Sequence, residues 1–281
     1  MVIVLSTARR LFMINVNLPV FLSYKYGNDI EEYLENEYQI EERKRKELEA
    51  QKLVEQIQRL KKRALESNKT MEEYIKAIIP IIVKHDLLVI ADEIYAELTY
   101  GQKHVSIAEI DGMKERTLIA SGFSKAFAMT GWRLGYAMGP KPIIDAMSKL
   151  HQVAVICAPT TSQYAAVVAM NECDDEIDTM RRNYDMRRRF LINELNSIGL
   201  QCYNAQGAFY VFADITCTGM SSEEFCVNLL QQNHVAVIPG NAFGKAGEGF
   251  VRISYSYSLD HIMEATKRIK EFNSLTPVIT K

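Results

Sequence analysis

The chain has 281 residues, of which 48% are hydrophobic and 24% are charged. These proportions are ordinary for a soluble globular protein of one large or two smaller domains, and they exclude wholesale disorder and a fibrous repeat. The net charge of -2 gives no basic excess that would bind a nucleic-acid backbone, so we expect no nucleic-acid partner.

Cysteine usage and hydropathy indicate the compartment. The five cysteines are scattered and form no C-x-x-C pair, which favours a reducing compartment over a disulfide framework or a structural zinc site. The five histidines show no ligand spacing, so we expect no metal. No apolar run approaches the roughly 20 residues that span a bilayer, and we therefore expect a cytoplasmic protein without a membrane partner.

Residues 1–69 carry no motif that indicates chemistry. From Asp29 to Asn68 there is neither Gly nor Pro, charges are dense, and small or apolar residues recur three and four apart. This pattern predicts a charged amphipathic helix from about residue 29. Two heptads are too few to establish a coiled coil, and a helix that packs on its own domain is the simpler interpretation.

Residues 70–173 alternate between helical and strand patterns. Short apolar runs at Leu87–Ala91, Thr117–Ser121 and Arg133–Met138 are typical of buried strands. Segments with apolar residues at helical spacing precede the first run and follow the third. The order favours an α/β domain with a mostly parallel sheet.

Residues 174–281 begin with one long helical pattern, Asp174–Ile198, which Gly199 ends. Shorter strand patterns follow at Ala208–Ala213, Val235–Ile238 and Phe250–Tyr255, with helical patterns between and after them. We expect a smaller C-terminal α+β domain attached to a long linking helix.

Two polar clusters follow the first two predicted strands. Asp92–Tyr95 comes after one and Ser121–Lys125 after the other, with Arg133 eight residues beyond Lys125. Open parallel sheets bind ligands at the carboxyl ends of their strands. Taken alone, the acidic pair also resembles a nucleotide-hydrolysis motif, but the phosphate loop that such a site needs is absent from the sequence. Together, a carboxylate, a phenol, an amine, hydroxyls and a guanidinium suit a cofactor that is part pyridine, part aldehyde and part phosphate.

From about Thr70 onward the chain resembles the pyridoxal-phosphate-dependent class I/II aminotransferases of fold type I. The matching motifs occur in the same order as in the family and span roughly three quarters of the chain. Chance similarity does not explain a match of this extent. The motifs are His85–Tyr95, Ser121–Tyr136, Ala158–Gln163, Gly207–Phe212, Val237–Gly240 and Phe250–Tyr255.

The resemblance implies an enzyme that moves an amino group between an amino acid and a 2-oxo acid through a pyridoxal 5'-phosphate aldimine on Lys125. It also implies a homodimer. By the same match, Arg252 binds the α-carboxylate of the substrate, for which a guanidinium fork is well suited. The implied cofactor-binding residues are Asp92 at the ring nitrogen, Tyr95 at the ring hydroxyl, Lys125 at the aldehyde, and Ser121, Ser124 and Arg133 at the phosphate.

The N-terminal half of the family's large domain has no counterpart that we recognise in the sequence. The Asn-Pro-Thr-Gly motif of that half is missing, since no Asn-Pro dipeptide occurs. Residues 1–69 look too charged and too helical to supply strands, so we expect an exposed sheet edge. An alternative therefore stays open: a truncated, non-catalytic remnant in which the helix at residues 29–68 acts as an association module.

Overall fold

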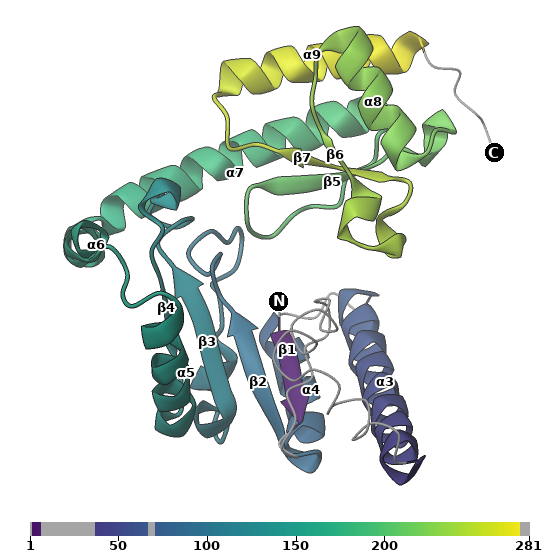
Figure 1. Ribbon diagram of the computed structural model, residues 1–281. Coiled ribbons are helices and arrows are strands. Elements are labelled where there is room, and N and C mark those ends of the chain that lie inside the picture. The colour runs from purple at the N-terminus through teal and green to yellow at the C-terminus, as the bar shows by residue number, and fades with distance from the viewer. Residues whose placement is uncertain (1, 7–36, 67–70, 276–281) are drawn as a thin grey trace. The chain divides into compact units, whose positions relative to one another are not determined.

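The computed structural model describes residues 2–6, 37–66 and 71–275 of the chain. The fold divides into two compact units built from interleaved segments (Figure 1). The first unit comprises Met1–Glu93, Val105–Ser121 and Tyr136–Cys157, and the second comprises Ile94–His104, Gly122–Gly135 and Ala158–Lys281. The domains expected from the sequence, 1–69, 70–173 and 174–281, stay a prediction.

The first unit is built on a four-stranded sheet in the order β1-β2-β3-β4 (Figure 1). Its strands are β1 (Val2–Ser6), β2 (Leu87–Asp92), β3 (Thr117–Gly122) and β4 (Gly135–Met138). The pair β2 and β3 is parallel, whereas β1 and β2 are antiparallel. The three strands expected between residues 87 and 138 are therefore present, and a fourth precedes them.

The orientation of β4 departs from the mostly parallel sheet that we expected. Gly139, just after β4, lies against Thr117 and Leu118 at the start of β3, so β4 runs opposite to β3. The connection between the two strands contains only a 3₁₀ turn, Thr130–Trp132. A parallel return would need a crossover, usually through an α-helix. Among the paired strands, only β2 and β3 fulfil the expectation.

A further strand, β1, lies beside β2, and the open sheet ends in β1 and β4. Strand β1 pairs with β2 along its whole length, from Val2 opposite Ala91 to Ser6 opposite Leu87. Residues 1–69 therefore do supply a strand, contrary to the expectation from their charge. The pairing satisfies backbone groups of β2 that would otherwise form an open edge.

Three helices accompany this sheet, α3 (Glu37–Glu66), α4 (Met71–Lys84) and α5 (Lys141–Ala154). Leu53 and Ile57 of α3 are half-buried against the core of the first unit, which supports the interpretation of this helix as packed on its own domain. Residues 29–36 and 67–68 of the predicted helix lie outside the described part of the chain. The core residues are Ile75, Ile78, Ile82, Leu87, Val89, Ala91, Ile107 and Met113.

The second unit is an antiparallel sheet, in the order β5-β7-β6, with helices against it (Figure 1). Alternation along the strands separates two faces: Val211 and Val251 are buried in the core, whereas Phe212 and Arg252 lie on the other face. Helix α7 (Asp174–Ser197) matches the predicted linking helix. The remaining elements are α6 (Thr160–Glu172), α8 (Ser222–Asn233), α9 (Leu259–Leu275), β5 (Tyr210–Asp214), β6 (Ile238–Pro239) and β7 (Phe250–Ser254).

Short 3₁₀ turns connect several of these elements. They span Ile107–Glu109, Lys114–Arg116, Thr216–Thr218, Gly240–Phe243 and Lys245–Gly247. Within the described ranges, no helix combines the length and the apolar character that crossing a membrane requires.

Candidate active site

The first unit contributes two of the predicted site residues at one edge of its sheet. Asp92 ends β2 opposite Ala120 of the parallel strand β3, so Ser121 lies one residue further along the same carboxyl edge. The Ser121 hydroxyl donates to the Glu93 carbonyl at 3.3 Å. The Glu93 carboxylate in turn accepts a hydrogen bond from Ser106 at 2.6 Å. A carboxylate and a hydroxyl thus share the edge where parallel sheets bind ligands.

The loop Gly122–Gly135, in the second unit, carries three more predicted residues. Its shape is fixed by internal hydrogen bonds: the Thr130 hydroxyl donates to the Ser124 carbonyl at 2.8 Å, and Arg133 Nη1 donates to the Thr130 carbonyl at 2.9 Å. Arg133 has a left-handed backbone, with a φ of 53°. Ser124, Lys125 and Arg133 therefore belong to one compact loop rather than to an extended chain.

This loop is attached to α6 by packing and by one buried hydroxyl. Phe123 and Met129 pack against Ala166 and Ala169 of the helix. The Ser162 hydroxyl, which is buried, donates to the Trp132 carbonyl at 2.7 Å. Because both ends of the loop contact the same helix, the backbone that carries Lys125 is anchored.

Aromatic rings flank the amine of Lys125. The Nζ atom lies 5.8 Å from the ring centroid of Tyr95 and 5.4 Å from that of Phe209. The two rings meet edge to face, with centroids 5.6 Å apart. Such rings attract a cation through their π faces. The structure thus brings together Tyr95 and Lys125, which the sequence had placed on separate motifs.

Tyr184 of α7 packs against Phe209. Their ring centroids are 5.5 Å apart. Partial burial raises the pKa of the Tyr184 phenol above its ordinary value. Tyr184 thus packs on Phe209, the ring that lies beside the Lys125 amine.

Arg252, the predicted carboxylate-binding residue, lies on β7, the central strand of the second sheet. Its cross-strand neighbours are Phe212 and Ile238. The guanidinium carbon lies 4.4 Å from the ring centroid of Tyr210 and 4.5 Å from that of Phe243. Contacts with ring faces leave the N–H donors of the fork in their own plane, where a carboxylate binds.

Sequence reasoning missed the aromatic residues of this site. Phe209 and Tyr210 belong to Gly207–Phe212, which we quoted as a matching motif without assigning roles to its side chains. Phe243 lies three residues beyond the matching motif Val237–Gly240. Tyr95 connects the surroundings of Lys125 with those of Arg252, because its ring centroid also lies 6.4 Å from that of Tyr210. Only the fold reveals these contacts, because packed rings do not follow a fixed spacing along the sequence.

Comparison with known proteins shows the family to which this chain belongs. The sequence model of the family "Aminotransferase class I and II" matches residues 68–269. The chain belongs to that family. A putative aminotransferase, YugH, of Bacillus subtilis (strain 168) is 49% identical over 201 residues, which cover 72% of this chain and 52% of the relative. Aspartate aminotransferase of Pyrococcus abyssi (strain GE5 / Orsay) is 45% identical, with coverage of 70% and 51%.

Solved structures give the same result. The aromatic aminotransferase from Pyrococcus horikoshii OT3 superposes with a TM-score of 0.72 at 42% identity, covering 74% of this chain and 56% of that one. The resemblance stated from the motifs is therefore confirmed, as is the α/β class. The chain spans about half the length of the curated relatives that it matches.

Proposed function

We propose that this chain carries the lysine-bearing part of an aminotransferase, which moves an amino group between an amino acid and a 2-oxo acid with pyridoxal 5'-phosphate. The observation that carries the proposal is the amine of Lys125 beside the phenol ring of Tyr95, in the same unit as the ring-flanked guanidinium of Arg252. Family membership supports it.

The donor set of this chain fits the cofactor. A primary amine binds an aldehyde, a phenol pairs with a ring hydroxyl, and a hydroxyl with a guanidinium binds a phosphate. The second unit carries all of these groups, and the first carries a carboxylate suited to a protonated ring nitrogen. The residues proposed for these roles are Lys125, Tyr95, Ser124 and Arg133 in the second unit, with Asp92 and Ser121 in the first.

Each group has one task in the proposed reaction. The bound cofactor supplies an electron sink for the charge that develops at the substrate Cα. The amine of Lys125 would take the proton from that Cα as a general base and then pass it, as a general acid, to the aldehyde-derived carbon of the cofactor. Asp92 keeps a proton on the ring nitrogen, which maintains the sink. Arg252 binds the α-carboxylate through two parallel hydrogen bonds, so the substrate approaches in one orientation.

Covalent attachment of the cofactor tests this proposal. The protein is incubated with pyridoxal phosphate at millimolar concentration and reduced with borohydride, and peptide mass spectrometry locates the label. We expect saturable attachment at Lys125 that Lys125→Ala abolishes, while Lys245→Ala, at an exposed lysine of the same unit, has no effect. Label spread evenly over surface lysines would refute the proposal.

The homodimer implied by the family resemblance forms part of the proposal. Large apolar side chains are exposed on α6, at Tyr164, Val167 and Met170, and contiguous apolar surface commonly marks an interface. Sedimentation of the chain at micromolar concentration measures its mass. A monomer at every concentration would remove this part alone.

The alternative, an association module centred on residues 29–68, has less support. Leu53 and Ile57 of α3 already pack on the first unit, so this part of the helix is occupied within its own chain. Deletion of residues 37–66 together with a measurement of sedimentation distinguishes the two. Loss of self-association on this deletion, together with no cofactor attachment in the full chain, would favour the non-catalytic remnant.

A further inference from the structure

The segment that carries Phe209 is fixed by neighbours on both sides. The Ala208 amide donates to the Leu98 carbonyl at 2.9 Å, and the Tyr255 amide donates to the Phe209 carbonyl at 3.0 Å. Gly207 permits this approach, because a Cβ there would lie 3.2 Å from the Leu98 carbonyl oxygen. The backbone at Ala208 is therefore enclosed between two other segments of the second unit.

Two buried hydroxyls converge on one carbonyl in this segment. Tyr100 donates to the Ala208 carbonyl at 2.5 Å and Tyr255 donates to the same oxygen at 3.0 Å. Ala208 itself has a φ of 61°, a left-handed conformation that L residues rarely adopt. Tyr100 and Tyr255 are 4% and 0% exposed, respectively. The strained residue is thus held by the pair of hydroxyls.

Both hydroxyls remain donors over a wide pH range. Burial raises the pKa of Tyr100 to about 12. Burial, together with the neighbouring Tyr100, also raises the pKa of Tyr255 far above its ordinary value. Neither phenol loses its proton near neutral pH, so both hydroxyls keep the proton that they donate to the Ala208 carbonyl.

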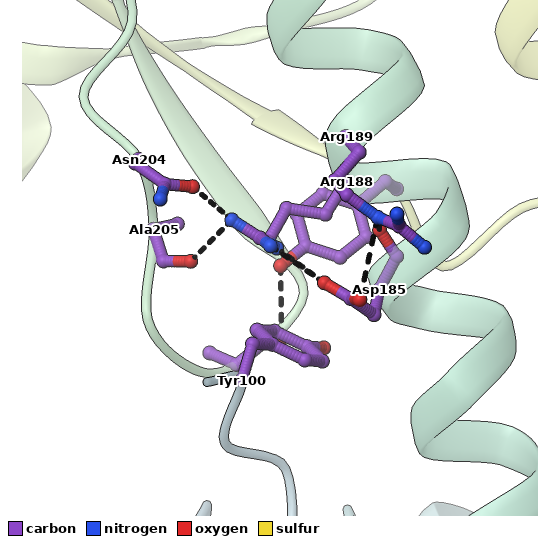
Figure 2. Close-up of polar contacts among 8 residues, drawn as sticks. Tyr100, Asp185, Arg188, Arg189, Asn204 and Ala205 are labelled. Atoms are coloured by element: carbon purple, nitrogen blue, oxygen red, sulfur yellow. Dashed lines mark hydrogen bonds and ion pairs between the residues drawn. The ribbon is translucent and has the colours of Figure 1, made fainter. Parts of the chain in front are cut away.

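An arginine network keeps Tyr100 in place (Figure 2). Arg188 lies with its guanidinium carbon 5.1 Å from the Tyr100 ring centroid and is 7% exposed. It donates to Asp185 through Nε at 2.9 Å and through Nη2 at 2.6 Å. Its Nη1 donates to the Asn204 side chain and to the Ala205 carbonyl, the latter at 3.0 Å. Because every nitrogen of the guanidinium is engaged, the ring beneath it has little freedom to shift.

We propose that Tyr100 and Tyr255 are positioning residues, which hold the Ala208 carbonyl and thereby fix the Phe209 ring against the Lys125 amine. The inference rests on the proposed function, because it concerns the amine that would bind the cofactor. Phe209 directly follows Ala208, and its ring lies 5.4 Å from Lys125 Nζ. A backbone rotation at Ala208 would move this ring. The two hydroxyls prevent that rotation. They therefore determine how accessible the Lys125 amine is to a reactant.

The experiment measures the reactivity of Lys125 without any cofactor. Formaldehyde and cyanoborohydride at limiting concentration methylate the lysines, and peptide mass spectrometry gives the Lys125 rate relative to that of Lys245, which is exposed. For Tyr100→Phe and Tyr255→Phe we expect the ratio to rise about three- to tenfold, the factor that one hydrogen bond supplies. Ala208→Gly, which loosens the same backbone without removing a hydroxyl, should raise it as well.

A double-mutant cycle separates positioning from general loosening. In a Phe209→Leu background the ring is absent, so Tyr255→Phe should raise the ratio no further. The matched control is Thr266→Val, which removes another buried hydroxyl from the second unit, one that donates to the Met263 carbonyl at 2.9 Å. It should leave the ratio unchanged. The inference would be overturned if the ratio were unchanged in both Tyr variants and in Ala208→Gly. It would also be overturned if Tyr255→Phe had the same effect with and without the Phe209 ring. Since no cofactor is present, failure of the proposed function would appear separately, as absent attachment to the wild-type chain.

Discussion

The guanidinium carbon of Arg252 lies 4.4 Å from the centroid of the Tyr210 ring, and the ring of Phe243 lies at 4.5 Å. A guanidinium flanked in this way loses little freedom when it binds a carboxylate, because its orientation is already set. A lysine at this position would retain the charge but would lose the planar fork.

Arg252→Lys should therefore raise the KM for the amino acid by about 10- to 100-fold, the cost of a charge-assisted hydrogen bond. Attachment of pyridoxal phosphate to Lys125 should stay unchanged, since Arg252 is assigned to the substrate. Steady-state kinetics and borohydride trapping measure the two quantities separately. Loss of attachment in this variant would contradict the assigned role.

Arg133→Ala should weaken the binding of pyridoxal phosphate by roughly 10- to 100-fold, because one charged donor to the phosphate is lost. Equilibrium titration with the cofactor, followed by its absorbance, measures the change. Arg59→Ala, at an exposed position of α3, is the matched control and should bind as the wild type does. Equal affinities for the wild type and Arg133→Ala would exclude a phosphate contact at Arg133.

Asp92→Asn should lower turnover on the order of 100-fold while cofactor attachment persists, because an amide holds a proton on the ring nitrogen far less well than a carboxylate does. Single-turnover kinetics isolate the proton-transfer step from binding. A variant that turned over at the wild-type rate would show that Asp92 does not contact the ring nitrogen.

Alkaline pH should reveal the burial of Tyr100. The unfolded chain releases the phenol proton near the ordinary pKa of 10.0, whereas the folded chain retains it to about 12. The unfolded state therefore binds fewer protons in this window, and the free energy of unfolding should fall as pH rises from 10 towards 12. Denaturant unfolding at stepped pH measures the slope, which Tyr100→Phe should make shallower. The same pH dependence of the free energy of unfolding in the wild type and in Tyr100→Phe would contradict a raised pKa at Tyr100.

Most of the helices and strands followed from local patterns, whereas helix α6 (Thr160–Glu172) was not predicted. The long helix was predicted at Asp174–Ile198 and found at Asp174–Ser197, because periodicity and the terminal Gly199 are local signals. Strand β1 was not expected. Its partner β2 lies more than 80 residues away along the chain, from Val2 opposite Ala91, and no local signal encodes a pairing of that separation.

The site divides in the same way. Lys125 and Tyr95 were predicted because their chemistry is specific and their motifs follow strands. Phe209 and Phe243 were not predicted, because an aromatic side chain in a sequence is most often part of a core, and only the fold brings its ring to an amine or a guanidinium.

The most direct test is a half-reaction. The chain is saturated with pyridoxal phosphate and given a mixture of the protein amino acids without any 2-oxo acid, and the 2-oxo acid released per chain is counted by mass spectrometry. We expect close to one equivalent from the wild type and none from Lys125→Ala. Saturable cofactor attachment to Lys125 without any released 2-oxo acid would contradict aminotransferase activity in this chain.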